Sequence, residues 1–188
     1  MTALQTLAKL EHLKSIFDTL IRGRHLNRLH DGPWWNELEA EQETYEGLFA
    51  LLGFSLRVDP RGFAWFHNDE PAANIANKTR TLALLMLALF ERQADKGMNL
   101  ASFHEWRLDQ DLLEELLQEG RATLEAEGLG SIDAMVAAMG TAVAYSFAAK
   151  EGPDRWRLLP ATWRYLDAFD ALARDHESST NVLAEDEP

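Results

Sequence analysis

Hydrophobic and polar positions follow two different periods along this chain, and both occur between residues 47 and 66. Apolar residues at helical spacing lead up to Gly53, where a helix is expected to end. Residues 54–58 (FSLRV) then alternate between apolar and polar, which is the period of a half-buried strand. Residues 59–62 (DPRG) have the composition of a tight turn, and residues 63–66 (FAWF) return as a second strand. The pattern predicts a helix that leads into a short antiparallel hairpin.

A similar order recurs in the second half of the chain. Residues 132–139 have a helical pattern, and Gly140 is expected to end that helix. Residues 142–149 (AVAYSFAA) can be extended, although they also fit a helix, and residues 151–154 form a turn before residues 155–159 return. A helix followed by a hairpin is the second half of a winged helix. The repetition therefore predicts tandem winged-helix domains in a mainly α protein with short β-hairpins, of the α+β class.

The remaining elements complete two predicted domains. In the first domain (residues 1–70) we expect a helix whose apolar face runs from Leu4 to Ile21, a short strand at residues 25–29, a helix beginning at residues 31–33 (DGP), and a helix from Glu39 to Leu52. After a connector (residues 71–78), the second domain (residues 79–175) is expected to contain a helix from Thr79 to Lys96, a short strand within Met98–Trp106, a helix from Leu108 to Glu127 bent at Gly120, an N-cap at Ser131, and a last helix from Pro160 to Arg174. Residues 176–188 are polar and acidic and are predicted to be disordered.

The composition places the protein among soluble globular proteins. Of its 188 residues 46% are apolar, and none is cysteine, which excludes disulfides and thiolate metal sites. No apolar run is long enough to span a membrane, and the N-terminal segment has charges that a signal peptide lacks. We expect a cytoplasmic protein that does not bind membranes.

The charge distribution argues against sequence-specific DNA reading. The formal net charge is −13, which disfavours strong binding to phosphates. In a winged helix that reads DNA, the helix before the hairpin needs donors and positive charge. The two helices in that position, residues 41–52 and 131–139, contain no Lys or Arg. Both units are therefore predicted to contact proteins.

Catalytic patterns are absent from the sequence. The six histidines are scattered singly, without an acidic partner at zinc-ligand spacing. There is no phosphate-binding loop and no nucleophile motif, and the residues 129–131 (LGS) lack the glycine spacing of a dinucleotide site. The sequence predicts no enzyme activity, no cofactor, no metal and no small-molecule substrate.

Three arginine groups are candidate DNA contacts. They are Arg22, Arg24 and Arg28 after the first helix, Arg57 and Arg61 on the first hairpin, and Arg155 and Arg157 on the second. Arginines on a wing can reach phosphates or the minor groove. The alternative for each group is a solvated charge that keeps a sheet edge from pairing with another chain.

Aromatic and leucine side chains are candidates for a partner or dimer surface. Trp34 and Trp35 are neighbours on a predicted helix, where side chains point about 100° apart, so both cannot face inward. One of them, or Trp65, could be a partner anchor, and the alternative is a cap on the edge of the core. The helix of residues 79–90 is apolar nearly all round, including Leu84 and Leu87. We expect a homodimer formed through this helix or through the first helices.

The chain resembles the MksE/MukE-type subunits of bacterial condensin-like SMC complexes, including the related small subunit of Wadjet plasmid-defence systems. The resemblance rests on four segments: LIRGRHL (residues 20–26), YEGLFALLGFSLRVDPRGFAWF (residues 45–66), NKTRTLALLMLALF (residues 77–90) and RWRLLPATWRYLDAF (residues 155–169). It covers the chain from about Leu4 to Arg174, and its motifs are packing and turn patterns.

The resemblance implies a homodimer of tandem winged-helix protomers that binds a kleisin subunit. The kleisin in turn bridges an SMC ATPase, and the nucleoid-associated complex organises DNA in chromosome segregation or in defence against plasmids. The resemblance also implies DNA contact within the assembled complex, for which this sequence offers the three arginine groups. The alternative is a stand-alone winged-helix transcription regulator, which would need basic residues on its reading helices.

Overall fold

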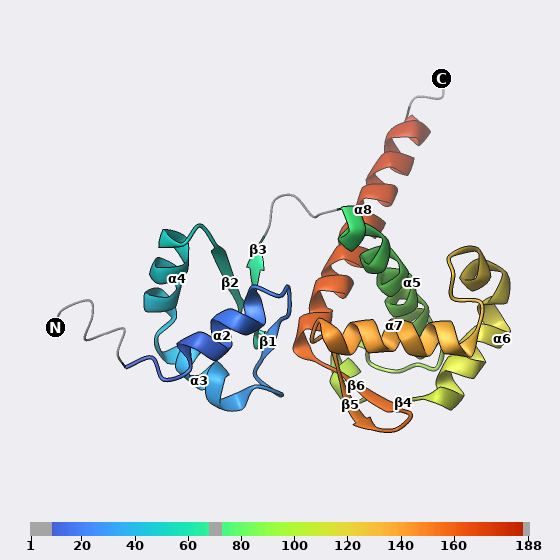
Figure 1. The fold of residues 1–188 in the computed structure, drawn as a ribbon. Helices are drawn as coiled ribbons and strands as arrows, with labels where there is room; N and C mark the ends of the chain where they lie inside the picture. Colours follow the sequence, from blue (N-terminus) through green and yellow to red (C-terminus); the bar gives the residue numbers. More distant parts are fainter. Residues whose placement is uncertain (1–8, 68–72, 186–188) are drawn as a thin grey trace.

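The computed structural model describes residues 9–67 and 73–185, with side chains for residues 9–67 and 80–174. They form two lobes that lie side by side, each with helices around a three-stranded sheet (Figure 1). The elements of the first lobe are α2 (Leu13–Leu20), β1 (Leu26–Asn27), α3 (Gly32–Ala40), α4 (Gln42–Leu51), β2 (Ser55–Asp59) and β3 (Phe63–His67). Those of the second lobe are α5 (Ala73–Asp95), the 3-10 helix η1 (Leu100–Glu105), β4 (Leu108–Asp109), α6 (Gln110–Ala126), α7 (Ile132–Ala144), β5 (Ala148–Gly152), β6 (Arg155–Leu158), the 3-10 helix η2 (Pro160–Thr162) and α8 (Trp163–Glu185).

The two sheets have the same topology. The strand orders are β1-β3-β2 and β4-β6-β5, and all pairs are antiparallel. In each lobe a two-residue strand that precedes the hairpin in the chain pairs with the last strand of that hairpin. Both predicted hairpins are confirmed, as is the short strand within residues 25–29, and the mixed α and β content agrees with the predicted class.

The helix before each hairpin ends in the same motif, a left-handed residue flanked by two backbone hydrogen bonds to the last turn. In α4 that residue is Gly53 (φ +83°), followed by a bond from the Phe54 N–H to the Phe49 carbonyl at 2.9 Å. In α7 it is Ser146 (φ +61°), followed by the equivalent bond from Phe147 to Ala142 at 2.8 Å. The prediction that Gly140 ends α7 was therefore wrong. The helix passes through Gly140, and residues 142–144 are helical, which is the alternative that the sequence left open.

Other boundaries also differ from the prediction. α2 begins at Leu13, and not nearer Leu4, because the His12 N–H that would extend the helix bonds to the Glu37 carboxylate at 3.0 Å. The residues before 9 lie outside the described part. The strand predicted within Met98–Trp106 is a 3-10 helix, η1, and the strand itself is β4, immediately after it.

Two predicted irregular segments are helical. α5 begins at Ala73, inside the predicted connector of residues 71–78, and no glycine or proline interrupts it before Asp95. α8 continues to Glu185, through most of the segment of residues 176–188 that was predicted to be disordered. The bend at Gly120 in α6 and the N-cap at Ser131 are confirmed.

Each lobe has its own core. The first core joins ten buried residues, which are Leu10 and nine residues of α2, α3, α4 and the first sheet, including Trp35 and Phe49. The second surrounds α5, α6, α7 and the second sheet, and it also takes in Phe63 from β3 of the first lobe. The lobes are thus joined through the hairpin of the first lobe as well as through the chain itself.

Candidate functional site

A buried polar network fixes the two lobes against each other. Its centre is Asn27, whose side chain is fully buried. The Asn27 amide donates to the Ser146 carbonyl at 2.9 Å, and its oxygen accepts from the Ala161 N–H at 2.9 Å. Arg24 adds a hydrogen bond to the Ser146 hydroxyl at 3.2 Å. These contacts hold Ser146 in the left-handed conformation that ends α7, which otherwise costs a residue with a Cβ about 1 kcal/mol or more.

His25 lies beside this network and is only 3% exposed. Its Nδ1 lies 2.8 Å from the Tyr145 carbonyl, so Nδ1 carries the proton and donates. Nε2 is then free to accept from the Arg164 guanidinium at 2.7 Å. Burial, together with the nearby Arg164 charge, lowers the pKa of His25 to about 3 despite the hydrogen bond to Tyr145. The histidine is therefore a neutral bridge between the lobes.

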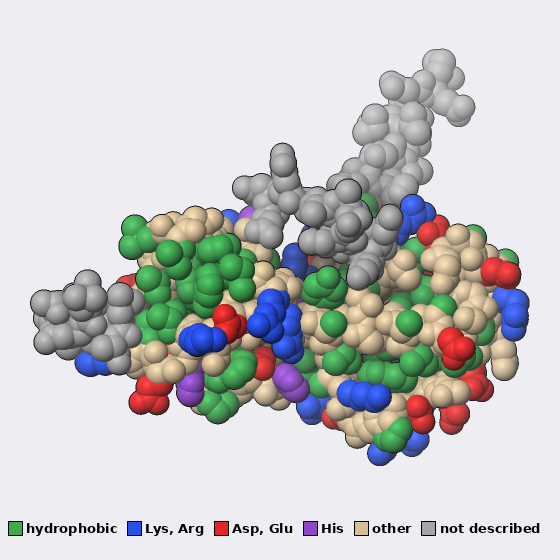
Figure 2. Space-filling view, in the orientation of Figure 1, with side chains coloured by type: hydrophobic (Ala, Val, Ile, Leu, Met, Phe, Trp, Pro, Cys, Tyr) green, Lys and Arg blue, Asp and Glu red, His purple; other side chains and the backbone are tan. Residues whose placement is uncertain are grey.

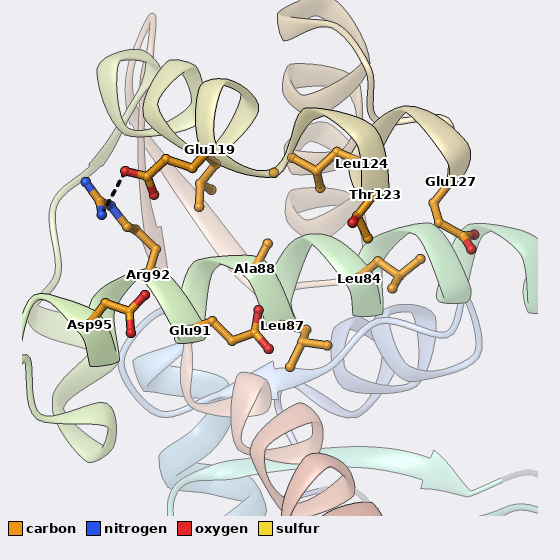
Figure 3. Close-up of a pocket in the computed structure, with 12 residues that line it drawn as sticks. Leu84, Leu87, Ala88, Glu91, Arg92, Asp95, Glu119, Thr123, Leu124 and Glu127 are labelled. Atoms are coloured by element: carbon orange, nitrogen blue, oxygen red, sulfur yellow. Dashed lines mark ion pairs between the residues drawn. The ribbon is translucent and has the colours of Figure 1, made fainter.

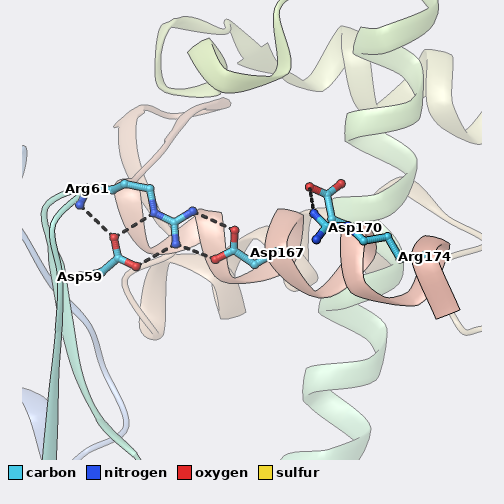
Figure 4. Close-up of polar contacts among 5 residues, drawn as sticks. All are labelled: Asp59, Arg61, Asp167, Asp170 and Arg174. Atoms are coloured by element: carbon cyan, nitrogen blue, oxygen red, sulfur yellow. Dashed lines mark hydrogen bonds and ion pairs between the residues drawn. The ribbon is translucent and has the colours of Figure 1, made fainter.

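Arg61, at the tip of the first hairpin, is the third link between the lobes. Its guanidinium binds Asp59 on its own hairpin and forms two hydrogen bonds to Asp167 of α8, at 2.8 and 2.6 Å (Figure 4). It also lies over the Trp163 ring, 4.9 Å from the centroid. These bonds to Asp59 and Asp167 raise the pKa of Arg61, and the bond from Arg61 is the main cause of the lowered pKa of Asp59. An arginine held by two carboxylates is not available to a phosphate, so the structure does not support the predicted DNA contact by Arg61.

We expect Arg61→Ala to lower the free energy of unfolding by about 1 kcal/mol, the upper end for a partly exposed ion pair with good geometry. The loss is modest because Asp167 is exposed and can return to water. Arg57→Ala on the same hairpin is the matched control, since Arg57 has no ion pair within the described part of the chain. Urea unfolding followed by tryptophan fluorescence measures both. Equal stability of the two variants would contradict this role of Arg61.

The other predicted arginines divide into paired and unpaired side chains. Arg28 binds Glu39 and lies over the Trp35 ring, and Arg157 lies 3.2 Å from Glu151. Arg24 belongs to the junction, by which we mean the contacts of Asn27, His25 and Arg61 that connect the two lobes. Within residues 9–67 and 80–174, the arginines without an ion pair or hydrogen bond from these groups are Arg22, Arg57 and Arg155. Arg22 follows α2, Arg57 is on β2 and Arg155 is on β6.

The first lobe carries an exposed apolar face at the end of α4. Leu51 is 87% exposed and Leu52 56%, and no charged residue occurs from residue 47 to residue 56. Beside them three partly buried phenylalanines are in mutual contact, with ring centroids 4.8–6.1 Å apart: Phe17, Phe54 and Phe66. Figure 2 shows hydrophobic side chains gathered over α2, α4 and β2 in this lobe. We call these five residues the α4 face.

The sequence did not single out the α4 face, although one signal was available. Leu51 and Leu52 are adjacent at the end of a helix, so both cannot be buried, by the same reasoning that applies to Trp34 and Trp35. That reasoning is confirmed for the tryptophans: Trp35 is 1% exposed, while Trp34 is partly buried against the first core. Because Trp35 is buried, the structure does not support its predicted role in partner contact.

The other residues predicted for a partner surface lie in two places. Trp65 is partly buried at the junction, where the Arg164 guanidinium lies 4.8 Å from its ring centroid. Leu84 and Leu87 are partly buried on α5 and line a groove between α5 and α6. The structure therefore separates the predicted residues and leaves only Leu84 and Leu87 together.

Neither a metal site nor a membrane segment is found in the part of the chain that the structure describes. No group of three or more His, Asp or Glu side chains there is arranged to hold an ion. No helix among the described residues has the length and hydropathy needed to cross a bilayer.

Comparison with known proteins gives one family match. A family model described as condensin complex protein MksE matches residues 11–169, which include all of the junction and the α4 face. No curated protein matches the chain.

Proposed function

Because the match extends over most of the chain, the protein belongs to the MksE family of condensin complex proteins, and from this premise we propose that it is a non-catalytic subunit that dimerises and binds the kleisin of its complex. The kleisin would link it to the SMC ATPase, which supplies the chemistry, and the complex would act on DNA in the cytoplasm, in chromosome segregation or in plasmid defence.

One observation carries this proposal: the helix before the first hairpin presents leucines where a DNA-reading helix would present basic side chains. α4 begins with acidic residues and ends in the α4 face, and it contains no Lys or Arg. α7, its counterpart in the second lobe, also has none. Base and phosphate contacts require donors and positive charge, whereas an exposed apolar face favours a protein partner. The same observation disfavours a stand-alone transcription regulator.

The two lobes are assigned as winged-helix domains, with the predicted division after residue 70. Support comes from the matching strand orders of the two sheets and from the left-handed residue that ends the helix before each hairpin. DNA contact within the complex is assigned to Arg22, Arg57 and Arg155. This assignment follows from the exclusion of those predicted arginines whose charges are already paired or committed to the junction.

The kleisin part of the proposal is tested by co-expression. The full chain, co-expressed with the kleisin subunit of its complex and with a tag on the kleisin alone, is expected to co-purify with it as one complex on size exclusion. A wild-type chain that elutes apart from a folded kleisin would reject the proposed function.

The dimer part is tested at the α4 face. Leu51→Lys/Leu52→Lys is expected to weaken dimerisation at least about 100-fold, because burial of a leucine is worth about 1.5–3 kcal/mol. Lysine is chosen because positive charge suits the end of a helix, so the fold is retained. The control is Leu172→Lys, since Leu172 is 59% exposed and lies on α8. Sedimentation equilibrium at micromolar concentration decides: a monomeric wild type, or an equally dimeric double variant, would reject this interface.

A further inference from the structure

A groove of about 270 Å³ lies between α5 and α6 on the second lobe, away from the α4 face. α5 forms one wall and α6 the other (Figure 3). Its apolar lining consists of Leu84, Leu87 and Ala88 from α5 and Leu116 and Leu124 from α6. The volume is below the roughly 300–1,000 Å³ of sites that enclose a small organic ligand. It suits a few apolar side chains presented by another polypeptide.

Ion pairs link the two walls of the groove and so fix the spacing between them. Arg80 of α5 binds Glu127, which directly follows α6, at 2.6 Å, and Arg92 of α5 binds Glu119 of α6 at 2.9 Å. Between these pairs, α6 loses helical geometry at Gly120 (φ −107°, ψ 16°). A Cβ at Gly120 would approach the Leu124 side chain to 3.4 Å. The kink and the ion pairs together give the groove its shape in the isolated chain.

The border of the groove is acidic. Its lining residues include four carboxylates, Glu91, Asp95, Glu119 and Glu127, against one cation, Arg92. Glu119 and Glu127 are engaged by arginines, as above, whereas Glu91 and Asp95 are exposed and have no ion pair within the described residues. They are four residues apart on α5, and Leu87 and Leu84 lie about one and two turns before Glu91. In Figure 3, Glu91 and Leu87 lie along the edge of α5 that faces away from α6.

We propose that this groove binds an amphipathic helix of a partner subunit, with apolar side chains in the groove and Lys or Arg beside Glu91 and Asp95. The inference rests on the proposed function, since it takes the partner to be a subunit of the same complex. Helices bound in grooves use apolar anchors at three- and four-residue spacing, which matches the spacing along α5. Opposite charges at the border would fix the orientation of the helix and speed its association.

The acidic border of the groove disfavours three other ligands: the C-terminal segment of this chain, a second copy of the chain, and nucleic acid. The segment of residues 176–188 of this chain has four acidic residues and no Lys or Arg, so it would be repelled. A second copy that offered the same groove would place like charges opposite each other, which is unfavourable. Nucleic acid is excluded for the same reason, because its phosphates would meet carboxylates.

The test uses the full chain and the kleisin subunit of its complex. Glu91→Lys/Asp95→Lys is expected to weaken kleisin binding at least about tenfold at physiological salt, as expected from the loss of two border ion pairs and the like-charge repulsion that replaces them. The control, Glu43→Lys/Asp154→Lys, makes the same change in net charge at exposed sites outside the groove and is expected to bind like wild type. Isothermal titration calorimetry measures the affinities. Unchanged binding by the groove variant would overturn this inference and leave the proposed function standing.

A second measurement decides about the groove even without the kleisin. Two synthetic helical peptides share the same leucine pattern, and one has lysines on its flanks where the other has glutamates. Wild-type protein is expected to bind the lysine peptide at least about tenfold more tightly by fluorescence anisotropy, and Glu91→Lys/Asp95→Lys is expected to reverse the preference. Equal binding of the two peptides would overturn the inference. The inference would also be overturned if the Glu91→Lys/Asp95→Lys variant still bound the lysine peptide more tightly than the glutamate peptide.

Discussion

Replacement of Asn27 by alanine is expected to lower the free energy of unfolding by about 2–6 kcal/mol, because two buried backbone groups would each lose their hydrogen bond. The groups are the Ser146 carbonyl and the Ala161 N–H, and both lie in the second lobe. Each buried group left unsatisfied costs about 1–3 kcal/mol. Ser146 would also lose a contact that holds its left-handed backbone.

The prediction is measured by urea unfolding, followed by tryptophan fluorescence and by circular dichroism. Asn36→Ala is the matched control: it makes the same chemical change at an exposed position on α3, where alanine is at least as good a helix former, so no loss is expected. Asn27→Ala is also expected to separate the unfolding of the lobes, since the junction couples them. An Asn27→Ala variant as stable as the Asn36→Ala control would contradict the role of the network.

The first lobe could be predicted from the sequence because its signals are local. Gly53 ends α4 by itself, since only glycine adopts a left-handed conformation without cost. In the second lobe the corresponding residue is Ser146, and nothing nearby in the sequence marks it as left-handed. The contacts that hold it come from Arg24 and Asn27, more than a hundred positions earlier. A search for local helix breakers therefore chose Gly140, which has open space around it and lies inside the helix.

The candidate contact surfaces were also difficult to predict, because they depend on contacts between residues that are far apart in the sequence. An arginine at a hairpin tip predicts a DNA contact only while its partners are unknown, and Asp167, which binds Arg61, is 106 residues away. Adjacent apolar residues on a helix show that one must be exposed, but the burial of Trp35 depends on the packing of α3 against the rest of the first core. The absence of Lys and Arg from α4 and α7 needed no structure. It is also the feature on which the proposed function depends.

His25 is expected to make the protein less stable as the pH falls below about 6.5. In the folded state burial holds its pKa at about 3, whereas in the unfolded chain the ring titrates near its ordinary value of about 6.5. Above pH 6.5 the ring is neutral in both states, so it does not make the free energy of unfolding depend on pH. Between these two pKa values His25 is protonated in the unfolded state and neutral in the folded state. The free energy of unfolding therefore falls by about 1.4 kcal/mol for each unit by which the pH is lowered. The expected loss from His25 is about 2 kcal/mol at pH 5.

The groups around the ring explain why it stays neutral in the folded state. The Tyr145 carbonyl holds the Nδ1 proton, and the Arg164 cation donates to Nε2, where a second proton would have to bind. The Phe147 ring lies 4.4 Å from the imidazole, centroid to centroid, and the Trp65 ring 6.4 Å. Protonation would therefore place a charge beside another cation, within aromatic surroundings.

Because carboxylates and other histidines also titrate, the contribution of His25 is the difference between wild type and His25→Gln. The variant is expected to be less stable at pH 7.5, since glutamine fits the junction less well, but to lose about 2 kcal/mol less than wild type between pH 7.5 and pH 5. Urea unfolding at several pH values measures both slopes. The ¹⁵N shifts of the ring provide an independent check, since a neutral ring protonated at Nδ1 should persist in the folded protein at pH 5. Parallel slopes for the two proteins, or a doubly protonated His25 at that pH, would show that the ring is not the buried neutral bridge on which the contact between the lobes depends.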